Sequence, residues 1–414
     1  MHLQKARGVL LCVFGLSLAA TSAFSQKTTL TGFIDAQGGQ HVFYLDKNSN
    51  LNQLIFLGGK AWGSQNLTGT FGGSLPAANT ALTGFVDASG GQHVFYVDAN
   101  NNVNQMYTPG PGNGETWYPQ NLTGVFGGNA ANPTALTSFY DPTDGSEHVF
   151  YLGLSVTTTT PSPVSVNQIF FWPSTNTWYP QDLSDTYGGN AAQSTSHITS
   201  YLDNVGGEHV VFQSDNGDIN QLFYPGSGLS WIAQDLTASY GGNTPSSPTG
   251  LSSYIDAVGG QHVVYVDAKG NVDQLAYITG AGWLFQNVTI LASGAASGGS
   301  NVATYVDSVG GQHLVFLDAA GNVSQLFNPT PGSILWYYQN LSGTYSGVAA
   351  GTLSSLAPFP STQSDSVFVG GDEHIAYVDV NENVDQLFYP SNGTTWFWQN
   401  LTSYAGSIPA LFPE

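Results

Sequence analysis

The sequence predicts an all-β protein and, within that class, a seven-bladed β-propeller with four antiparallel strands in each blade. Three observations support this fold. The composition is typical of short strands joined by turns, with 13% aromatic residues and, among 414 residues, 51 glycines and 20 prolines. One unit of 51–61 residues recurs seven times along the chain. Each unit divides into four short apolar runs that are separated by turn residues.

The repeat is defined by three positions that every unit contains. The first is a histidine in segments such as GGQHVFYLD: His41, His93, His148, His209, His262, His313 and His374. The second is a glutamine in segments such as NVDQLFY: Gln53, Gln105, Gln168, Gln221, Gln274, Gln325 and Gln386. The third is a tryptophan at the head of a W-x-x-Q-N/D segment: Trp62, Trp117, Trp178, Trp231, Trp283, Trp336 and Trp396.

The four strands of a unit follow one another with recognisable turns. In the first unit, residues 30–36 form the first run, a Gly-Gly turn follows, and residues 40–46 form the second. A polar turn such as DAKGN (267–271) leads to the third run (271–277), and a variable loop leads to the tryptophan strand. The second run is apolar on both faces, with Val42 and Tyr44 on one and Phe43 and Leu45 on the other. A sheet covered on both sides predicts blades that pack between neighbouring blades.

Two units depart from the pattern. The third carries an eight-residue insertion between its histidine and its glutamine, rich in Thr, Ser and Pro. The seventh is preceded by a Ser/Pro stretch (354–366) and lacks the first-strand aspartate found in the other six units. We expect both stretches to be projecting loops. The aspartates of the other units are Asp35, Asp87, Asp141, Asp203, Asp256 and Asp307.

The N-terminus has the features of a secretory signal peptide. Lys5 and Arg7 precede an apolar run (8–20), and small residues at 23 and 25 suit cleavage before Gln26. We therefore expect residues 1–25 to be a signal peptide, residues 26–414 to form the single propeller, and the protein to be secreted or periplasmic. The lone cysteine, Cys12, lies in the signal segment, so the remaining chain is predicted to have no disulfides. The sequence contains no apolar run long enough for a transmembrane helix.

The charge excludes several classes of partner. Beyond residue 25 the chain has 27 acidic residues, four lysines and no arginine, a net charge of −23. Such a chain repels nucleic-acid backbones and anionic lipids, and it has no guanidinium to bind phosphate or carboxylate. The composition therefore favours neutral ligands and excludes nucleic acid as a partner.

The three repeated residues have two interpretations. In six units the histidine and glutamine are 12 residues apart, which places them on one face as facing or diagonal cross-strand neighbours. Imidazole, amide and indole together suit a saccharide, because polar groups bind hydroxyls and the indole covers a C–H face. The alternative is structural: a buried histidine bonds the first-strand aspartate and locks neighbouring blades together, and the tryptophan belongs to the core.

Metal and enzyme signatures are weak or absent. The turns that begin at Asp46, Asp98 and Asp379 repeat an Asp-x-Asn-x-Asn pattern like the start of a calcium loop, but they lack its glycine and its final glutamate. We interpret them as hairpin turns, and no metal or cofactor site is predicted. Nucleophile-elbow and zinc-protease motifs are missing, and no acid pair stands out from the repeated aspartates.

The unit H-V-x-Y-x-D-x-x-G-N-V-x-Q-L-x-Y followed by W-x-x-Q resembles the repeat of the fucose-specific lectins with six- or seven-bladed propellers. The resemblance covers residues 26–414. It implies sugar sites between adjacent blades, where an arginine on the second strand, a glutamate on the third and aromatic side chains bind the sugar. By position, these roles fall on the seven histidines, the seven glutamines and the seven tryptophans. Both charged family residues are thus neutral here.

The leading hypothesis is a secreted, non-enzymatic, multivalent carbohydrate-binding protein with sites between blades and neutral glycans as ligands. The alternative is a cell-surface or protein-interaction scaffold in which the repeated residues are structural. A third interpretation is a secreted hydrolase with an asymmetric site near the insertions of the third or seventh unit.

Overall fold

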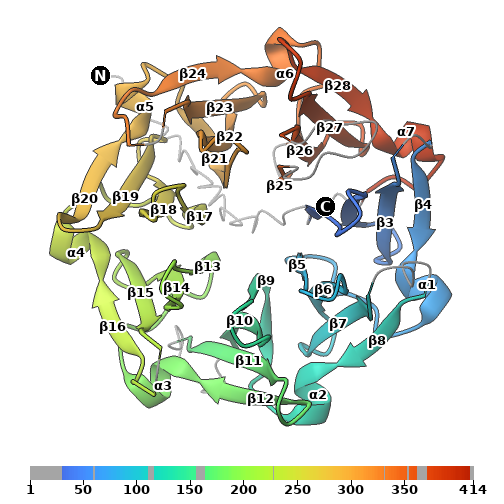
Figure 1. The fold of residues 1–414 in the computed structure, drawn as a ribbon, viewed down its shortest axis with the longest axis vertical. Helices are drawn as coiled ribbons and strands as arrows, with labels where there is room; N and C mark the ends of the chain where they lie inside the picture. Colours follow the sequence, from blue (N-terminus) through green and yellow to red (C-terminus); the bar gives the residue numbers. More distant parts are fainter. Residues whose placement is uncertain are drawn as a thin grey trace, which may run out of the picture.

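The computed structural model describes residues 30–58, 61–110, 116–154, 164–226, 228–330, 332–351, 354–360 and 371–410. These residues form seven four-stranded antiparallel sheets arranged around a central axis, which confirms the seven-bladed β-propeller (Figure 1). In every sheet the four strands follow the order of the chain. The fourth strands lie at the outer edge of the ring, and a short helix follows each of them (Figure 1).

The first four blades have the following elements. Blade 1 contains β1 (Leu30–Ile34), β2 (Gln40–Leu45), β3 (Leu51–Phe56), β4 (Gly63–Asn66) and α1 (Leu67–Phe71). Blade 2 contains β5 (Thr83–Val86), β6 (Gln92–Val97), β7 (Val103–Thr108), β8 (Tyr118–Asn121) and α2 (Leu122–Phe126). Blade 3 contains β9 (Ala131–Tyr140), β10 (Glu147–Gly153), β11 (Val166–Trp172), β12 (Thr177–Asp182) and α3 (Leu183–Tyr187). Blade 4 contains β13 (Ile198–Leu202), β14 (Glu208–Gln213), β15 (Ile219–Tyr224), β16 (Ile232–Asp235) and α4 (Leu236–Tyr240).

The last three blades repeat the plan. Blade 5 contains β17 (Leu251–Ile255), β18 (Gln261–Val266), β19 (Val272–Ile278), β20 (Gly282–Asn287) and α5 (Val288–Leu291). Blade 6 contains β21 (Ser297–Val306), β22 (Gln312–Asp318), β23 (Val323–Asn328), β24 (Tyr337–Asn340) and α6 (Leu341–Thr344). Blade 7 contains β25 (Leu356–Pro358), β26 (Glu373–Val378), β27 (Val384–Tyr389), β28 (Phe397–Asn400) and α7 (Leu401–Ala405).

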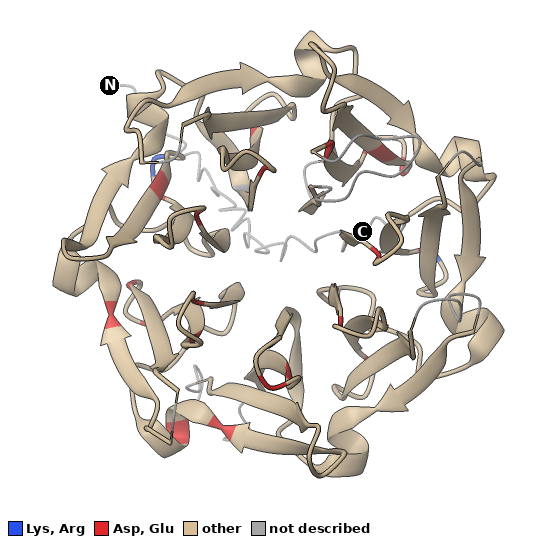
Figure 2. Cartoon of the chain, viewed as in Figure 1, with Lys and Arg blue, Asp and Glu red and all other residues tan. Residues whose placement is uncertain are grey.

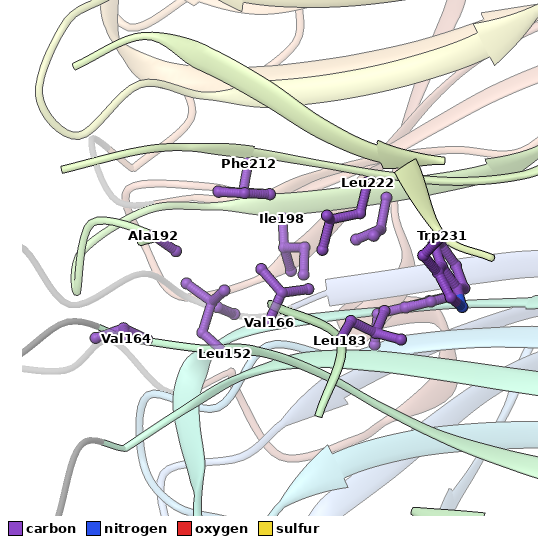
Figure 3. Close-up of a cluster of buried hydrophobic side chains, with 12 residues drawn as sticks. Leu152, Val164, Val166, Leu183, Ala192, Ile198, Phe212, Leu222 and Trp231 are labelled. Carbon is purple, nitrogen blue, oxygen red and sulfur yellow. The ribbon is translucent and has the colours of Figure 1, made fainter. Parts of the chain in front are cut away.

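The core consists of apolar clusters between neighbouring blades. Figure 3 shows one of them, in which Leu152 and Val166 of blade 3 meet Ile198 and Leu222 of blade 4, with Trp231 at the end of the row. The two middle strands of each blade are buried on both faces, as the run of apolar residues in the sequence predicts. Burial between blades is therefore the main stabilising term of the ring.

The ring closes without exchange of a strand. Within the described residues, every sheet is built from four strands that are consecutive in the chain. Blades 7 and 1 meet through an apolar cluster that includes Val42 and Tyr44 on one side and Val378 and Leu401 on the other. Asp46 also forms a β-bridge with Ala410, and the Tyr44 hydroxyl donates to the Ile408 carbonyl at 2.8 Å. Side-chain packing and the returning C-terminal segment thus join the two ends.

The short helices were not expected from the sequence, and the repeated Asn-Leu-Thr motif explains them. Asn66 caps α1, because its side chain accepts from the backbone N–H of Gly69. Leu67 is fully buried, and the Thr68 hydroxyl accepts from the backbone N–H of Leu51, the first residue of β3. The motif therefore ties the fourth strand to the third. None of the helices in the described part of the chain has the length and apolarity to cross a membrane.

The polar turn of blade 1 is a hairpin turn as expected, whereas part of one expected loop is a strand. Asp46 Oδ1 accepts from the backbone N–H groups of Asn48 and Asn50, at 2.8 and 3.0 Å, as in a hydrogen-bonded hairpin turn. The expectation that residues 354–366 are a loop is wrong in part, because β25 forms the inner strand of blade 7 there. Residues 361–366 of that stretch, most of the blade 3 insertion and the predicted signal peptide lie outside the described residues.

Candidate functional site

The repeated histidines and glutamines lie together on one face of each sheet. His41 in β2 is opposite Ile55 in β3, and Gln53 is opposite Phe43, so histidine and glutamine are diagonal neighbours. This is one of the two arrangements that the 12-residue spacing predicts. In all seven blades these side chains are buried, with the histidines 1–5% exposed and the glutamines 0–3%.

An aspartate, the histidine and the glutamine form a hydrogen-bonded chain in blades 1, 2, 4 and 6. In blade 1, His41 Nε2 donates to Asp35 Oδ2 at 2.9 Å, and Gln53 Nε2 donates to His41 Nδ1. Blade 5 keeps the bond between histidine and aspartate. In blade 3 the histidine contacts the Ser146 hydroxyl at 2.6 Å instead of Asp141. Buried networks of this kind fix the positions of their members.

A further repeated position links each blade to the preceding one. The residue immediately before each histidine is a glutamine or a glutamate, a signal that the sequence carries but that our sequence reasoning missed. Glu147 Oε2 lies 3.2 Å from His93 Nδ1 of blade 2. Likewise, the Tyr254 hydroxyl of blade 5 donates to Gln312 Oε1 of blade 6 at 2.9 Å. The seven residues are Gln40, Gln92, Glu147, Glu208, Gln261, Gln312 and Glu373.

The pKa values in this network shift in different directions: the pKa of Asp87 is lowered and those of His93 and His313 are raised, whereas burial raises the pKa of Glu147 and of Glu373. Burial alone would raise the pKa of Asp87, but hydrogen bonds from His93 and Ser89 outweigh it and lower that pKa to about 2. Burial opposes protonation of His93, yet its bond to Asp87 and the attraction of Glu147 raise its pKa. His313 follows the same rule between Asp307 and Glu373. These two histidines therefore act as bridges between carboxylates of neighbouring blades.

Asp307, His313 and Glu373 also form a group that has the side-chain types of a metal site. However, the two carboxylates lie on opposite nitrogens of the ring: Asp307 is 3.2 Å from Nε2 and Glu373 is 3.7 Å from Nδ1. One imidazole cannot direct both nitrogens at a single ion. We therefore interpret this group as an ion-paired bridge.

The repeated tryptophans lie between blades, and one of them differs from the rest. Trp117 and Phe43 of the preceding blade pack edge to face, with ring centroids 5.7 Å apart. Six tryptophans are only 2–8% exposed: Trp117, Trp178, Trp231, Trp283, Trp336 and Trp396. Trp62 of blade 1 is partly exposed and packs on Phe56, with ring centroids 5.5 Å apart.

Trp62 lines a cavity of about 200 Å³ between blade 7 and blade 1, which we call the seam pocket. Blade 1 contributes Gln40, Phe56, Ala61 and Trp62, and blade 7 contributes His374, Gln386, Phe388, Gln399 and Tyr404. None of these described residues is an aspartate, a glutamate, a lysine or an arginine. The pocket thus combines aromatic walls with a few neutral polar groups, the usual character of a small-molecule site.

The polar groups of the seam pocket are arranged differently from those in the other blades. Gln386 donates to Gln40 Oε1 at 3.3 Å and accepts from Gln399 Nε2. His374 has neither the aspartate partner nor the glutamine partner, and its Nδ1 has no hydrogen-bond partner among the described residues. Burial lowers the pKa of His374 to about 3, so the ring is neutral at neutral pH. It lies stacked with Phe359, with ring centroids 5.3 Å apart.

The structure therefore brings one predicted set together at a cavity: His374 and Gln386 from one blade, and Trp62 from the next. It places the other predicted residues in buried contacts within and between blades. Their burial is what the structural alternative expects, and a role for them in ligand binding stays a prediction. Sequence reasoning missed the other residues of the pocket, Gln40, Phe56, Ala61, Phe388, Gln399 and Tyr404.

Comparison with known proteins shows similarity in fold. No protein-family profile and no curated protein sequence matches the chain. A lectin from Burkholderia pseudomallei superposes with a TM-score of 0.65 at 16% identity, over 90% of this chain and 98% of that one. The Aleuria aurantia lectin, a six-bladed propeller that recognises fucose, gives 0.51 at 14% identity over 80% and 96%. A variant of the latter in complex with α-methyl-L-fucoside gives 0.51 at 11% identity over 94% and 97%. The chain therefore shares the β-propeller fold of these lectins.

Proposed function

We propose that the protein is a secreted, non-enzymatic carbohydrate-binding propeller, and that a saccharide binds in the seam pocket between blades 7 and 1. The observation that carries the proposal is the partly exposed Trp62 beside the neutral polar side chains of Gln40, Gln386 and Gln399. An indole face covers the C–H face of a sugar ring, while amides donate to and accept from its hydroxyls. The part of the proposal concerning secretion rests on the N-terminal sequence.

The charges of the molecule narrow the class of ligand. The described lining residues carry no charge, and His374 is neutral. Figure 2 shows acidic residues in all blades and few basic ones, in line with the net charge of −21 for the whole chain. An anionic sugar would be repelled by the protein and would find no cation in the described lining. A neutral saccharide is therefore the proposed ligand.

The structural neighbours suggest which saccharides to test first. The Aleuria aurantia variant is in complex with α-methyl-L-fucoside. At 11% identity this likeness concerns the fold only. Where the resemblance to fucose-specific lectins implies an arginine and a glutamate, this chain has histidine and glutamine. Fucosides are therefore the first candidates in a wider panel of neutral sugars.

The second candidate function is a protein-interaction or cell-surface scaffold. The observation that favours it is the burial of the histidines and glutamines, which bond within and between blades. In this case the seam pocket would have no saccharide ligand.

A glycan array tests the two proposals. The purified protein, with and without calcium, is expected to bind a restricted set of neutral glycans. Trp62→Ala is expected to lose this binding, whereas Trp172→Ala is expected to keep it. Trp172 is a suitable control because it is 40% exposed and belongs to blade 3, away from the seam pocket. A folded protein that binds no glycan, or an effect of Trp172→Ala equal to that of Trp62→Ala, would contradict the carbohydrate proposal.

A further inference from the structure

We infer that two side chains of each blade, those equivalent to Ala376 and Ala405 of blade 7, determine whether the space between that blade and the next is open. Alanine at both positions makes the seam the one open position within the described part of the ring. The inference rests on the proposed function where it concerns the number of ligands. The positions are equivalent in every blade. Position 376 lies two residues after the histidine, and position 405 lies six residues after the fourth-strand glutamine.

Both positions face the tryptophan of the following blade. In blade 1 the equivalents are Phe43 and Phe71, and both belong to the apolar cluster that encloses Trp117. In blade 4 the helix residue Tyr240 contacts Trp283, with ring centroids 6.4 Å apart. A residue of the preceding blade thus covers the tryptophan from each of two directions, the second strand and the helix.

The size of this pair differs from blade to blade and is smallest in blade 7. Blades 1 to 3 have two aromatic residues, and blades 4 and 6 have a valine and a tyrosine. Blade 5 has a valine and an alanine, and only blade 7 has two alanines. In order, the pairs are Phe43 and Phe71, Phe95 and Phe126, Phe150 and Tyr187, Val211 and Tyr240, Val264 and Ala292, Val315 and Tyr345, and Ala376 and Ala405. Trp62, which faces the last pair, is the repeat tryptophan that is partly exposed.

The space between blades 5 and 6 shows the effect of alanine at the helix position alone. Ala292 stands there in place of an aromatic residue, yet Trp336 is only 6% exposed. The residue types at the equivalent polar positions are the same as in the seam, namely His262, Gln274 and Gln312, although His262 keeps its bond to Asp256 and Tyr254 donates to both glutamines. His262 Nδ1 also has no hydrogen-bond partner in the described part of the chain. We attribute the closure of this position to Val264, which belongs to the same apolar cluster as Trp336. An alanine at the helix position alone is therefore not sufficient to open the space between two blades.

Among the described residues, the fold therefore holds one open and six closed copies of the histidine, glutamine and tryptophan set. Seven equivalent repeats would predict a multivalent protein, whereas this arrangement predicts one saccharide per chain. Two substitutions are expected to change the number of saccharides bound per chain in opposite directions. Ala405→Tyr closes the seam, because a tyrosine there can accept from Gln399, as Tyr345 accepts from Gln339 at 2.8 Å. Val264→Ala opens the position between blades 5 and 6.

The access of solvent to Trp62 and Trp336 can be measured without any ligand. Protein labelled with 5-fluorotryptophan gives a ¹⁹F signal for each tryptophan, and the shift between H₂O and D₂O reports solvent contact. Single Trp→Phe variants assign the signals of Trp62 and Trp336. We expect Ala405→Tyr to abolish the solvent shift of Trp62, and Val264→Ala to create one for Trp336. A solvent shift of Trp62 that survives Ala405→Tyr would overturn the inference. If Val264→Ala does not fold, Ala405→Tyr alone decides, because it fills space and removes no packing.

Calorimetric titration with the best glycan from the array then tests the number of sites. The expected values are one saccharide per unmodified chain, none for Ala405→Tyr and two for Val264→Ala. Several saccharides per unmodified chain would overturn the inference. If no glycan binds although the ¹⁹F signals change as expected, the proposed function fails and the control of opening stands.

Discussion

Asp385 in β27 offers a sharp test of how burial determines stability in this ring. The side chain is fully buried; Trp398 Nε1 donates to its Oδ2 at 2.8 Å, and Oδ1 has no hydrogen-bond partner among the described residues. Burial, with a contribution from the nearby Asp379, raises its pKa to about 7. Blades 1 to 4 have asparagine at this position. In blade 1, Asn52 donates to the carbonyl of Asn50 at 2.9 Å. We therefore predict that Asp385→Asn stabilises the protein.

The stability gained by Asp385→Asn is expected to increase as the pH rises. Because the folded pKa is raised, the folded state holds a proton that the unfolded state loses above pH 3.8. Stability is therefore lost as the pH rises from about 4 through 7. At about 1.4 kcal/mol per pH unit, the difference between 3.8 and about 7 sets an upper limit of about 4 kcal/mol. Relaxation around the carboxylate reduces this, so we expect a gain of about 1–3 kcal/mol above pH 7 and little change at pH 4.

Urea denaturation of the protein and of Asp385→Asn between pH 4 and pH 8 measures this gain. Asp215→Asn is the matched control, because it makes the same change in net charge at an exposed position in blade 4. The difference in free energy of unfolding between Asp385→Asn and the parent should grow with pH and level off above pH 7. A loss of stability at pH 8, or an equal response of Asp215→Asn, would refute the reasoning.

Three further predictions follow from the same contacts. Trp117→Ala should lower the free energy of unfolding by about 3–5 kcal/mol, because Trp117 is buried and its removal leaves a cavity in the core. Trp62→Ala should lower it less, because Trp62 is partly exposed, and urea denaturation of both variants measures the difference. Glu373→Gln should lower the pKa of His313, because the imidazolium loses one of its two carboxylates, and an NMR titration of the imidazole would show no change if the bridge were unimportant. Chelation of calcium should leave the melting temperature unchanged, because Asp46 Oδ1 already accepts two backbone N–H groups; a lowered melting temperature would contradict the hairpin-turn interpretation.

The fold was predictable because its determinants are local and repeat seven times. Alternation in runs such as 40–46 places Val42 and Tyr44 opposite Phe43, which predicts sheets covered on both faces. The 12-residue spacing predicts that His41 and Gln53 share a face. The helices were missed, because a helix of four or five residues has too few turns to show a helical period. Their signal is instead the capping asparagine or aspartate.

The candidate site was predictable only in part, because it depends on which blades are neighbours. His374, Gln386 and Trp62 were identified, but the seam joins residues 346 positions apart, such as Gln386 and Gln40. The lack of bulk at Ala376 and Ala405 is visible in the sequence. Its meaning appears only when blade 7 is known to lie against blade 1 and the tryptophan that those residues face is identified. Burial of the other six sets likewise depends on packing between blades.

The central claim is that the seam pocket binds the saccharide. A crystal structure of the protein with the best glycan from the array tests it most directly. We expect density for the sugar between blades 7 and 1, with its C–H face against Trp62 and its hydroxyls near Gln40, Gln386 and Gln399. Density for the sugar at another place on the propeller, with the seam pocket empty, would contradict it.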